Sequence, residues 1–309
     1  MRRLLPALSL ISACAVTAAL AGCAAAAPAA HRVPPRRPPS AMPRVTPRHP
    51  PPASYYLALG DSLSQGVQPD AAGVSISTPD GYPDQLYTLL RARQPGLRLI
   101  KLGCMGETTA TMINGGICHY AGGSQLAAAV RLLHSQRRVS LITLDIGAND
   151  PDSCITQPSV SKLAGCVGQA IPRATVNLAT ILARLRAAAP HTRIIAMNYY
   201  LPALAEWRDG LTGQAVARLV EPVIAGYNDL LGRVYQRFGV RVANVFGAFQ
   251  SGDFGNQVAV PGLGTLPRNV ADICRWTWEC AAPPRGPNVH ANQAGYRVIA
   301  QAFLTADGA

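Results

Sequence analysis

The chain has 309 residues, of which 49% are hydrophobic and 14% are charged, and its formal net charge is +12. This composition is typical of a globular protein and excludes a chain that is disordered throughout. Residues 1–54 hold seven arginines and no acidic residue, which leaves 21 basic and 16 acidic residues in the remainder. Because most of the excess charge lies in a segment with no aromatic residue before Tyr55, it does not indicate nucleic-acid binding.

Residues 1–23 have the layout of an export signal. Two arginines are followed by an apolar run from Leu4 to Ala21, and the segment ends in Leu20-Ala21-Gly22-Cys23. These last four residues resemble the lipobox of bacterial lipoproteins, which predicts lipidation of Cys23; cleavage within the following alanines is the alternative. A membrane-spanning helix is disfavoured because the run barely reaches the ~18 residues that one needs. We expect an exported protein, lipid-anchored on the outer face of the cell membrane or secreted.

Residues 24–54 are predicted to be a disordered tether, and residues 55–309 the folded domain. The tether holds ten prolines and five arginines, so it cannot bury enough apolar surface to fold. Proline-rich chains are extended, and the arginines favour attraction to anionic lipid or to wall polymer. We therefore expect a membrane as one partner.

Six cysteines remain in the domain once Cys14 and Cys23 are assigned to the signal, and an even number in an exported domain indicates disulfides. Sequential pairing is the simplest of the fifteen possible connectivities. A metal site is the alternative, but no Cys or His pattern at zinc-ligand spacing supports it. The predicted pairs are Cys104 with Cys118, Cys154 with Cys166, and Cys274 with Cys280.

The domain alternates apolar strands with helical patterns, beginning with a buried strand at 55–59 that ends at Gly60. Further strands are predicted at 97–102, 139–146, 193–198 and 240–245. Helices are predicted at 81–94, around 126–133, at 170–189, at 212–238 with an interruption near Pro222, and from His290 onward. Residues 246–289 show no period. Five strands alternating with helices predict an α/β domain with three layers, α/β/α, around a parallel sheet.

Polar and glycine-bearing turns follow the first three strands and carry Ser62, Gly106 and Asn149. The carboxyl ends of parallel strands meet at one edge of a sheet, and His290 can reach the same edge. Acyl transfer requires a hydroxyl nucleophile, an imidazole that takes its proton, and hydrogen-bond donors for the oxyanion. The backbone N–H groups of Ser62 and Gly106 and the Asn149 amide are candidate donors.

Four sequence blocks in this order resemble those of the SGNH hydrolases, also called GDSL esterases and lipases. The blocks are Gly60-Asp61-Ser62-Leu63, the Gly106 turn, Gly147-x-Asn149-Asp150 and His290-x-Asn292-x-x-Gly295-Tyr296. The resemblance spans about 55–304 and implies a flavodoxin-like sheet, ester hydrolysis and no cofactor. It also implies that Ser62 is the nucleophile, that Gly106 and Asn149 are oxyanion donors, and that His290 is the general base.

Two positions depart from the family pattern. Pro287 stands where many members have an Asp three residues before the His, and Ala291 stands where many have a Pro. A backbone carbonyl can replace the Asp as the acceptor that fixes the imidazole tautomer. We expect the Pro287 carbonyl in this role, with the Asn288 side chain as the second candidate. No carboxylate among the acids nearest this edge should then be indispensable for orienting the base; these acids are Asp145, Asp150, Asp272 and Glu279.

Other interpretations of single residues stay open. Asp150 is expected to bond loop amides rather than to react. His119 is the rival imidazole, although its surroundings match none of the four blocks. Trp276 and Trp278 can line an acyl pocket or cap the core.

The leading hypothesis is an extracellular serine esterase or lipase that hydrolyses small-molecule or lipid esters as a monomer without a cofactor. A polysaccharide O-acetyl esterase would use the same groups. A catalytically silent lipoprotein that binds a ligand in the cleft is the alternative from another class.

Overall fold

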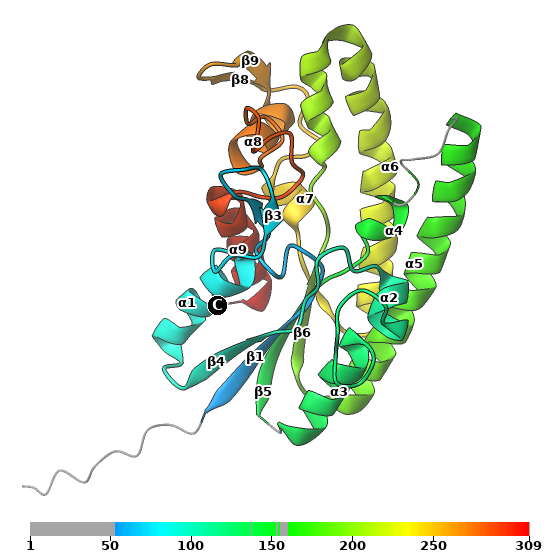
Figure 1. The fold of residues 1–309 in the computed structure, drawn as a ribbon, viewed down its shortest axis with the longest axis vertical. Helices are drawn as coiled ribbons and strands as arrows, with labels where there is room; N and C mark the ends of the chain where they lie inside the picture. Colours follow the sequence, from blue (N-terminus) through cyan, green and yellow to red (C-terminus); the bar gives the residue numbers. More distant parts are fainter. Residues whose placement is uncertain (1–52, 137, 153, 155–159, 309) are drawn as a thin grey trace, which may run out of the picture. The chain divides into compact units, whose positions relative to one another are not determined.

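The computed structural model describes residues 53–308, except for residues 137, 153 and 155–159. The predicted signal, Cys23 and nearly all of the predicted tether lie outside the described residues. A parallel five-stranded sheet with the order β4-β1-β5-β6-β7 forms the centre of the domain (Figure 1). Its strands are β1 (Ser54–Gly60), β4 (Leu97–Lys101), β5 (Val139–Asp145), β6 (Arg193–Met197) and β7 (Arg241–Ala243).

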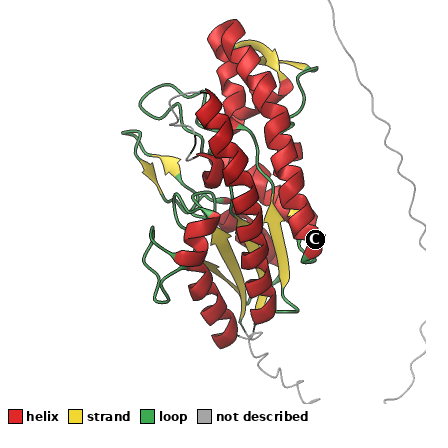
Figure 2. Cartoon of the chain, turned by 90° about the vertical axis from the view of Figure 1, so that its right-hand side faces the viewer, coloured by secondary structure: helices red, strands yellow, loops and turns green. Residues whose placement is uncertain are grey.

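Helices cover both faces of this sheet, which confirms the predicted three-layer class (Figures 1 and 2). One layer holds α1 (Tyr82–Arg93) and α9 (Gln293–Asp307), and the other holds α3 (Gln125–Ser135), α5 (Val160–Ala188) and α6 (Gly210–Arg237). The chain moves from β1 to one side through α1 and then to the other side through α3, α5 and α6. Right-handed crossovers in opposite directions place their helices on opposite faces. The point of reversal, between β1 and β5, is where such sheets bind ligands.

Shorter elements decorate the carboxyl edge of the sheet and the region beyond it, and none of them was predicted. They are β2 (Gln68–Pro69), β3 (Ser75–Ile76), α2 (Thr109–Asn114), α4 (Asn149–Asp152), the 3-10 helix η1 (Pro202–Asp209), α7 (Val245–Ala248), β8 (Gln257–Val260), β9 (Gly264–Pro267) and α8 (Arg268–Trp276). Residues 246–289 therefore hold an antiparallel hairpin, β8-β9, and a helix, although their sequence shows no period. No helix within the described ranges is long and apolar enough to cross a membrane.

Helix boundaries differ from the predictions in two places that matter. Helix α6 runs through Pro222 without a break, because it packs along η1 and over the sheet, and this packing outweighs the one hydrogen bond that proline removes. Helix α9 begins at Gln293 rather than at His290. The Asn292 side chain accepts a hydrogen bond from the Gly295 N–H and so marks the start of the helix. His290 therefore lies in the segment that precedes the helix.

The three predicted disulfides are all formed. Cys104–Cys118, Cys154–Cys166 and Cys274–Cys280 have Cα–Cα distances of 6.1, 5.6 and 4.9 Å. Each bond closes a short loop near the carboxyl edge of the sheet or beyond it. Because all six sulfurs are used in these bonds, the cysteines are not available as metal ligands.

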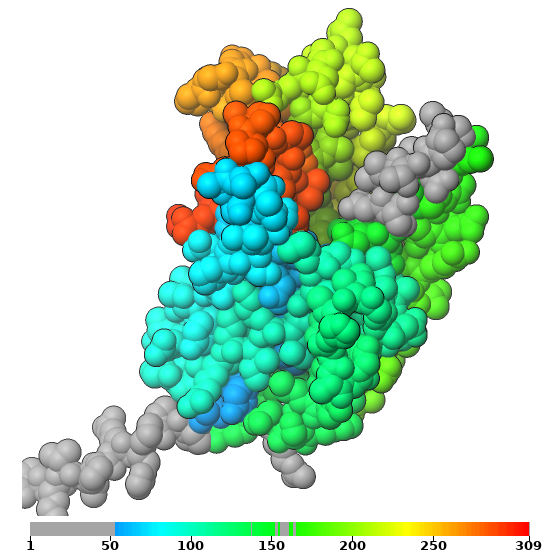
Figure 3. Space-filling view, in the orientation of Figure 1, coloured from blue at the N-terminus to red at the C-terminus, as the bar shows by residue number. Residues whose placement is uncertain are grey.

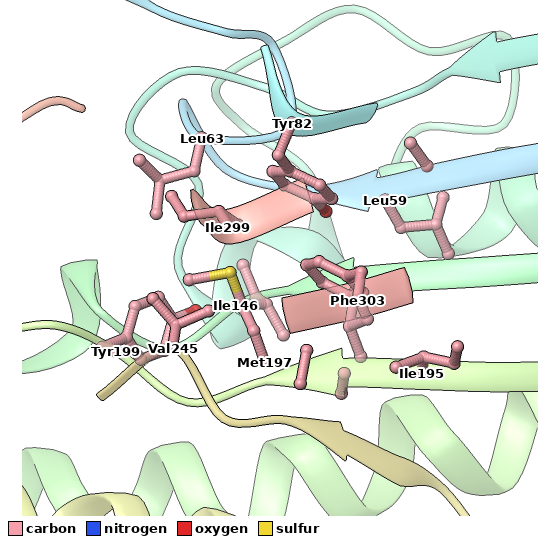
Figure 4. Packing of buried hydrophobic residues seen from close by; sticks show 14 of the residues in the cluster. Leu59, Leu63, Tyr82, Ile146, Ile195, Met197, Tyr199, Val245, Ile299 and Phe303 are labelled. Carbon is pink, nitrogen blue, oxygen red and sulfur yellow. The ribbon is translucent and has the colours of Figure 1, made fainter. Parts of the chain in front are cut away.

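The core between the sheet and the first helix layer is built around an aromatic pair. Tyr82 of α1 stacks on Phe303 of α9 with ring centroids 4.6 Å apart and planes 6° apart (Figure 4). Both side chains are fully buried, as are Leu59 and Ile195 of the strands beneath them. Burying one such aromatic side chain contributes about 1.5–3 kcal/mol, so the pair fixes both helices on the sheet.

The same tyrosine reaches through the core to a buried acid. The Tyr82 hydroxyl donates to Asp145 Oδ1 at 2.5 Å, and Asp145 Oδ2 accepts the backbone N–H groups of Asp61 and Ser64 at 3.2 and 3.1 Å. Burial, and next the nearby Asp61 carboxylate, raise the pKa of Asp145. Asp145 thus fixes the turn after β1 by hydrogen bonds to its backbone.

We predict that Tyr82→Phe lowers the free energy of unfolding by about 1–3 kcal/mol, because Asp145 Oδ1 loses its donor inside the core. Urea unfolding of the variant measures the change. Tyr55→Phe is the matched control, because Tyr55 is only half-buried at the start of β1, far from this acid along the strand. Equal midpoints for the two variants would contradict the support assigned to Asp145.

Candidate active site

Ser62 lies in a tight turn two residues beyond β1. Its carbonyl accepts hydrogen bonds from the N–H groups of Gln65 and Val67 at 3.2 and 3.1 Å, and the Leu63 N–H donates to Asp61 Oδ1 at 2.9 Å. The turn begins at Gly60, which has φ +138°, a conformation that favours glycine. The Ser62 side chain is largely buried, at 8% exposure. The turn therefore fixes the backbone of Ser62 beside the switch point of the sheet.

Gln125, at the start of α3, connects this turn to the loop after β4. Its Oε1 accepts the Gly60 N–H at 2.7 Å, and its Nε2 donates to the Gly60 carbonyl at 2.9 Å and to Glu107 Oε2 at 3.0 Å. The Gly60 carbonyl also accepts the Cys104 N–H at 3.1 Å. Sequence reasoning missed Gln125; the only signal was an uncharged polar residue at the start of an apolar helix.

Gly106 and Asn149 lie on adjoining loops. Gly106 has φ +79°, and no atom of the described residues lies within 4 Å of a Cβ placed on it, so the backbone conformation rather than crowding requires glycine. Asn149 Nδ2 donates to the Glu107 carbonyl at 2.8 Å. An amide nitrogen carries two hydrogens, so this bond uses only one of them. The three loops that carry Ser62, Gly106 and Asn149 are thus joined by hydrogen bonds.

Asp150 has the structural role that was expected for it. Its carboxylate accepts hydrogen bonds from the Thr109 N–H at 2.9 Å and the Thr109 hydroxyl at 2.5 Å, and this hydroxyl also accepts from Asn177 Nδ2 at 3.1 Å. Burial raises the pKa of Asp150 despite these bonds. The network fixes α4, and with it Asn149, against the start of α2.

His290 lies on a segment that pairs with the chain after α8. The Trp278 N–H donates to the His290 carbonyl at 3.0 Å, and Thr277 and Ala291 form an isolated antiparallel bridge. The Tyr296 hydroxyl donates to the Val67 carbonyl at 2.8 Å. The segment is therefore fixed to the chain that leaves the Ser62 turn.

The acceptor for the His290 ring is the Asn288 side chain, the second of the two candidates, and not the Pro287 carbonyl. Asn288 Oδ1 lies 2.8 Å from His290 Nδ1. Burial lowers the pKa of His290 to about 4.

Three of the four acids that the sequence places near this edge make other contacts, and the fourth, Glu279, has a raised pKa. Asp145 and Asp150 make the contacts described above, and Asp272 lies 3.8 and 3.6 Å from the guanidinium groups of Arg268 and Arg275. Burial, and next the Glu206 carboxylate, raise the pKa of Glu279 to about 7. The ring of His290 is thus held by an amide.

The two tryptophans differ in their surroundings. Trp276 packs on the core, with its ring edge-on to Phe249 at 5.1 Å between centroids, so it caps the core. Trp278 is half-buried, and its Nε1 donates to Gln68 Oε1 at 3.4 Å. The rival imidazole, His119, is exposed in the first disulfide loop.

The surface in front of these loops is hollowed between the orange-red segment near residue 280 and the green segment near residue 150 (Figure 3). A cavity of about 270 Å³ borders α4. More of its lining surface is apolar than polar, and its polar side chains include Thr108, Asp150, Arg173 and Asn177. A larger cavity, of about 580 Å³, lies at the opposite end of the sheet, where β5 and β6 begin, away from these groups. No group of three or more His, Cys, Asp or Glu side chains in the described part is placed to hold a metal ion.

A hydroxyl on a fixed turn, a partly buried imidazole, and N–H groups on adjoining loops are the kinds of group that acyl transfer needs. Together with the α/β/α fold they define the class of a carboxylic ester hydrolase. The chain belongs to the GDSL-like lipase/acylhydrolase family, whose model matches residues 58–298. No curated protein matches the chain.

Solved structures share the fold at low sequence identity. The extracellular lipase of Streptomyces rimosus is 18% identical with a TM-score of 0.52, and the match covers 82% of this chain and 100% of that one. An acetylxylan esterase of Geobacillus stearothermophilus is 16% identical with a TM-score of 0.51, covering 84% and 95%. A lipase from a goat rumen metagenome is 16% identical with a TM-score of 0.54, covering 82% and 97%.

Proposed function

We propose that this ester hydrolase is an exported serine esterase in which Ser62 is the nucleophile and His290 the general base. The oxyanion donors are the N–H groups of Ser62 and Gly106 and the side chain of Asn149. The observation that carries the proposal is the hydrogen-bonded linkage of the three loops through Gln125 and the Glu107 carbonyl. Such a linkage fixes the donors before substrate arrives, which is what oxyanion stabilisation requires.

The proposed reaction has two steps, acylation of Ser62 and hydrolysis of the acyl-serine. Ser62 Oγ attacks the ester carbonyl carbon while its proton passes to His290 Nε2, and the donors hold the oxyanion. The intermediate collapses to an acyl-serine, and the alcohol leaves with the proton from Nε2. Water then repeats the sequence on the acyl-serine and releases the carboxylic acid.

Export is supported by the three disulfides, because disulfides persist in oxidising surroundings outside the cytoplasm. Lipidation of Cys23, anchoring through the tether of residues 24–54 and a monomeric state complete this part of the proposal. The tether would meet the domain at Ser54, the first residue of β1 and hence at the end of the sheet opposite the candidate site.

Esters with an apolar acyl part are the leading substrate class. Met105 and Val289 directly precede Gly106 and His290, and their side chains are exposed at 39% and 50%. Exposed apolar side chains thus stand beside Gly106 and beside His290, and they offer an acyl chain contacts that water does not.

A polysaccharide O-acetyl esterase is the second candidate. The observation in its favour is the cavity next to α4, where the polar side chains of Arg173, Asn177 and Thr108 can bond to the hydroxyls of a sugar. In this alternative the alcohol part of the ester, rather than the acyl part, supplies the binding energy.

Ser62→Ala is expected to abolish hydrolysis of aryl esters and labelling by a fluorophosphonate probe, because the variant lacks the attacking oxygen. Thermal unfolding should change little, since the turn is held by the backbone of Ser62 and not by its hydroxyl. Ser64→Ala is a poor control because the buried Ser64 hydroxyl bonds the Asp61 carbonyl inside the same turn. Ser135→Ala is the matched control, because the Ser135 hydroxyl bonds the Leu132 carbonyl on the exposed end of α3. Persistent labelling of Ser62→Ala would reject the assignment.

Asn149→Ala should lower kcat by ~10²–10³ with little effect on KM, as the loss of one oxyanion donor does. Steady-state kinetics on one aryl ester measure both constants. Asn114→Ala serves as the control, because Asn114 is an exposed amide at the end of α2 that donates to the Ala110 carbonyl of its own helix. A rise in KM alone for Asn149→Ala would make it a substrate-binding residue instead.

A series of aryl esters of increasing acyl length, assayed beside acetylated sugars, separates the two substrate classes. If the acyl part supplies the binding energy, kcat/KM rises with chain length, and Val289→Ser lowers it for long acyl chains only. If acetylated sugars are preferred and Asn177→Leu raises their KM, the enzyme is an O-acetyl esterase.

A further inference from the structure

The Asn288 side chain has three polar contacts that together determine its orientation. Its Oδ1 accepts the backbone N–H of His290 at 3.1 Å and lies 2.8 Å from His290 Nδ1. Its Nδ2 donates to Ser75 Oγ on β3 at 3.1 Å. The amide therefore bridges the His290 segment and the β2-β3 hairpin.

The backbone contact decides which end of the amide faces the imidazole. A backbone N–H can only donate, so the atom opposite the His290 N–H must be the carbonyl oxygen of the amide and not its NH₂ group. That oxygen can only accept. Nδ1 must then carry the ring hydrogen, which leaves the lone pair on Nε2.

We propose that Asn288 is a positioning residue that fixes His290 in the Nδ1–H tautomer and so keeps Nε2 available to take the proton of Ser62. This inference rests on the proposed Ser62–His290 mechanism and assigns to a neutral amide the task that the family pattern gives to an Asp at position 287. No proton moves to Asn288 in any step, because the Nδ1–H bond stays intact while Nε2 gains and loses its proton. Ser75 holds the NH₂ end of the amide.

Because Asn288 is neutral, it does little to favour the protonated form of His290. A carboxylate beside Nδ1 would favour the imidazolium, whereas an amide oxygen stabilises it much less. The charged groups on the surrounding elements are Asp61 after β1, Asp80 before α1, Glu206 on η1 and Arg275 on α8, with Glu279 and Arg285 on the same loop. None of the ion pairs within the described residues includes His290. Burial is the cause that lowers the pKa of His290 to about 4.

The test replaces the amide by its isosteric acid. In Asn288→Asp the carboxylate keeps the acceptor for Nδ1 but adds a negative charge, so the acid limb of the kcat/KM profile should move up by ~1–3 pH units relative to the parent enzyme. Above that limb the variant should stay active. Asn114→Asp, on the exposed end of α2, adds the same charge away from the site and should leave the limb unchanged.

Removal of the acceptor gives the second measurement. Asn288→Ala should lower kcat towards the ~10⁴-fold loss that follows when an imidazole is free to take the wrong tautomer, with KM nearly unchanged. Ser75→Ala should lower kcat less, because the backbone N–H of His290 still orients Oδ1. Melting curves of the variants establish that they are folded.

The outcomes separate the two proposals. If Ser62→Ala is inactive but Asn288→Asp keeps the acid limb of the parent, the positioning role is wrong and the Ser62–His290 mechanism stands. The positioning role is equally wrong if folded Asn288→Ala keeps the parent kcat. If Ser62→Ala remains active, the proposed mechanism fails, and the role of Asn288 fails with it.

Discussion

The absence of a side chain at Gly60 is the constraint on which the rest of the site depends. A Cβ there would lie 2.1 Å from the Asp145 carbonyl oxygen, and the residue has φ +138°, so any other residue would both clash and be strained. Because the backbone is bare, Gln125 can bond both its N–H and its carbonyl, and Asp145 can approach the turn that follows. These contacts set the position of Ser62 relative to the loop of Gly106. The position of the serine is therefore determined by a packing requirement at the end of β1.

The sheet and its order of strands follow from local sequence, because each strand is an apolar run that ends at a turn, and the handedness of crossovers limits how such strands connect. The same logic places Ser62, Gly106 and Asn149 at one edge, since all three follow strands that are neighbours in the sheet. It fails for residues 246–289. The hairpin β8-β9 and α7 are four-residue elements, too short for a period to show. The start of α9 depends on the cap at Asn292, a signal that the apolar period from His290 onward obscures.

The roles of two residues of the site do not follow from the sequence pattern, for different reasons. Gln125 lies 65 positions from Gly60, so its role depends on how α3 settles on the sheet. Asn288 was a candidate, but its sequence position allows either its side chain or the preceding carbonyl to face the imidazole. The choice depends on the rotamer of Asn288, which is fixed by hydrogen bonds from its loop to Ser75 and Trp278. Sequence shows that the usual Asp is missing; only the packed loop shows which atom replaces it.

Burial lowers the pKa of His290, and a neutral acceptor does not raise it as a carboxylate would. Acid pH therefore affects the stability of the fold before it affects the charge of the base. An unfolded histidine has a pKa of about 6.5, whereas burial lowers the pKa of His290 to about 4 in the folded chain. Between these two values the unfolded chain binds a proton that the folded chain does not, so stability falls as pH decreases through this range. Over the same range the folded imidazole stays neutral and able to accept the proton of a serine. The lower pH limit of such an enzyme is then set first by how well the fold resists protonation and only later by the charge of its base. A carboxylate in place of Asn288 would reverse this order, because it would raise the pKa of the folded imidazole towards or above the unfolded value.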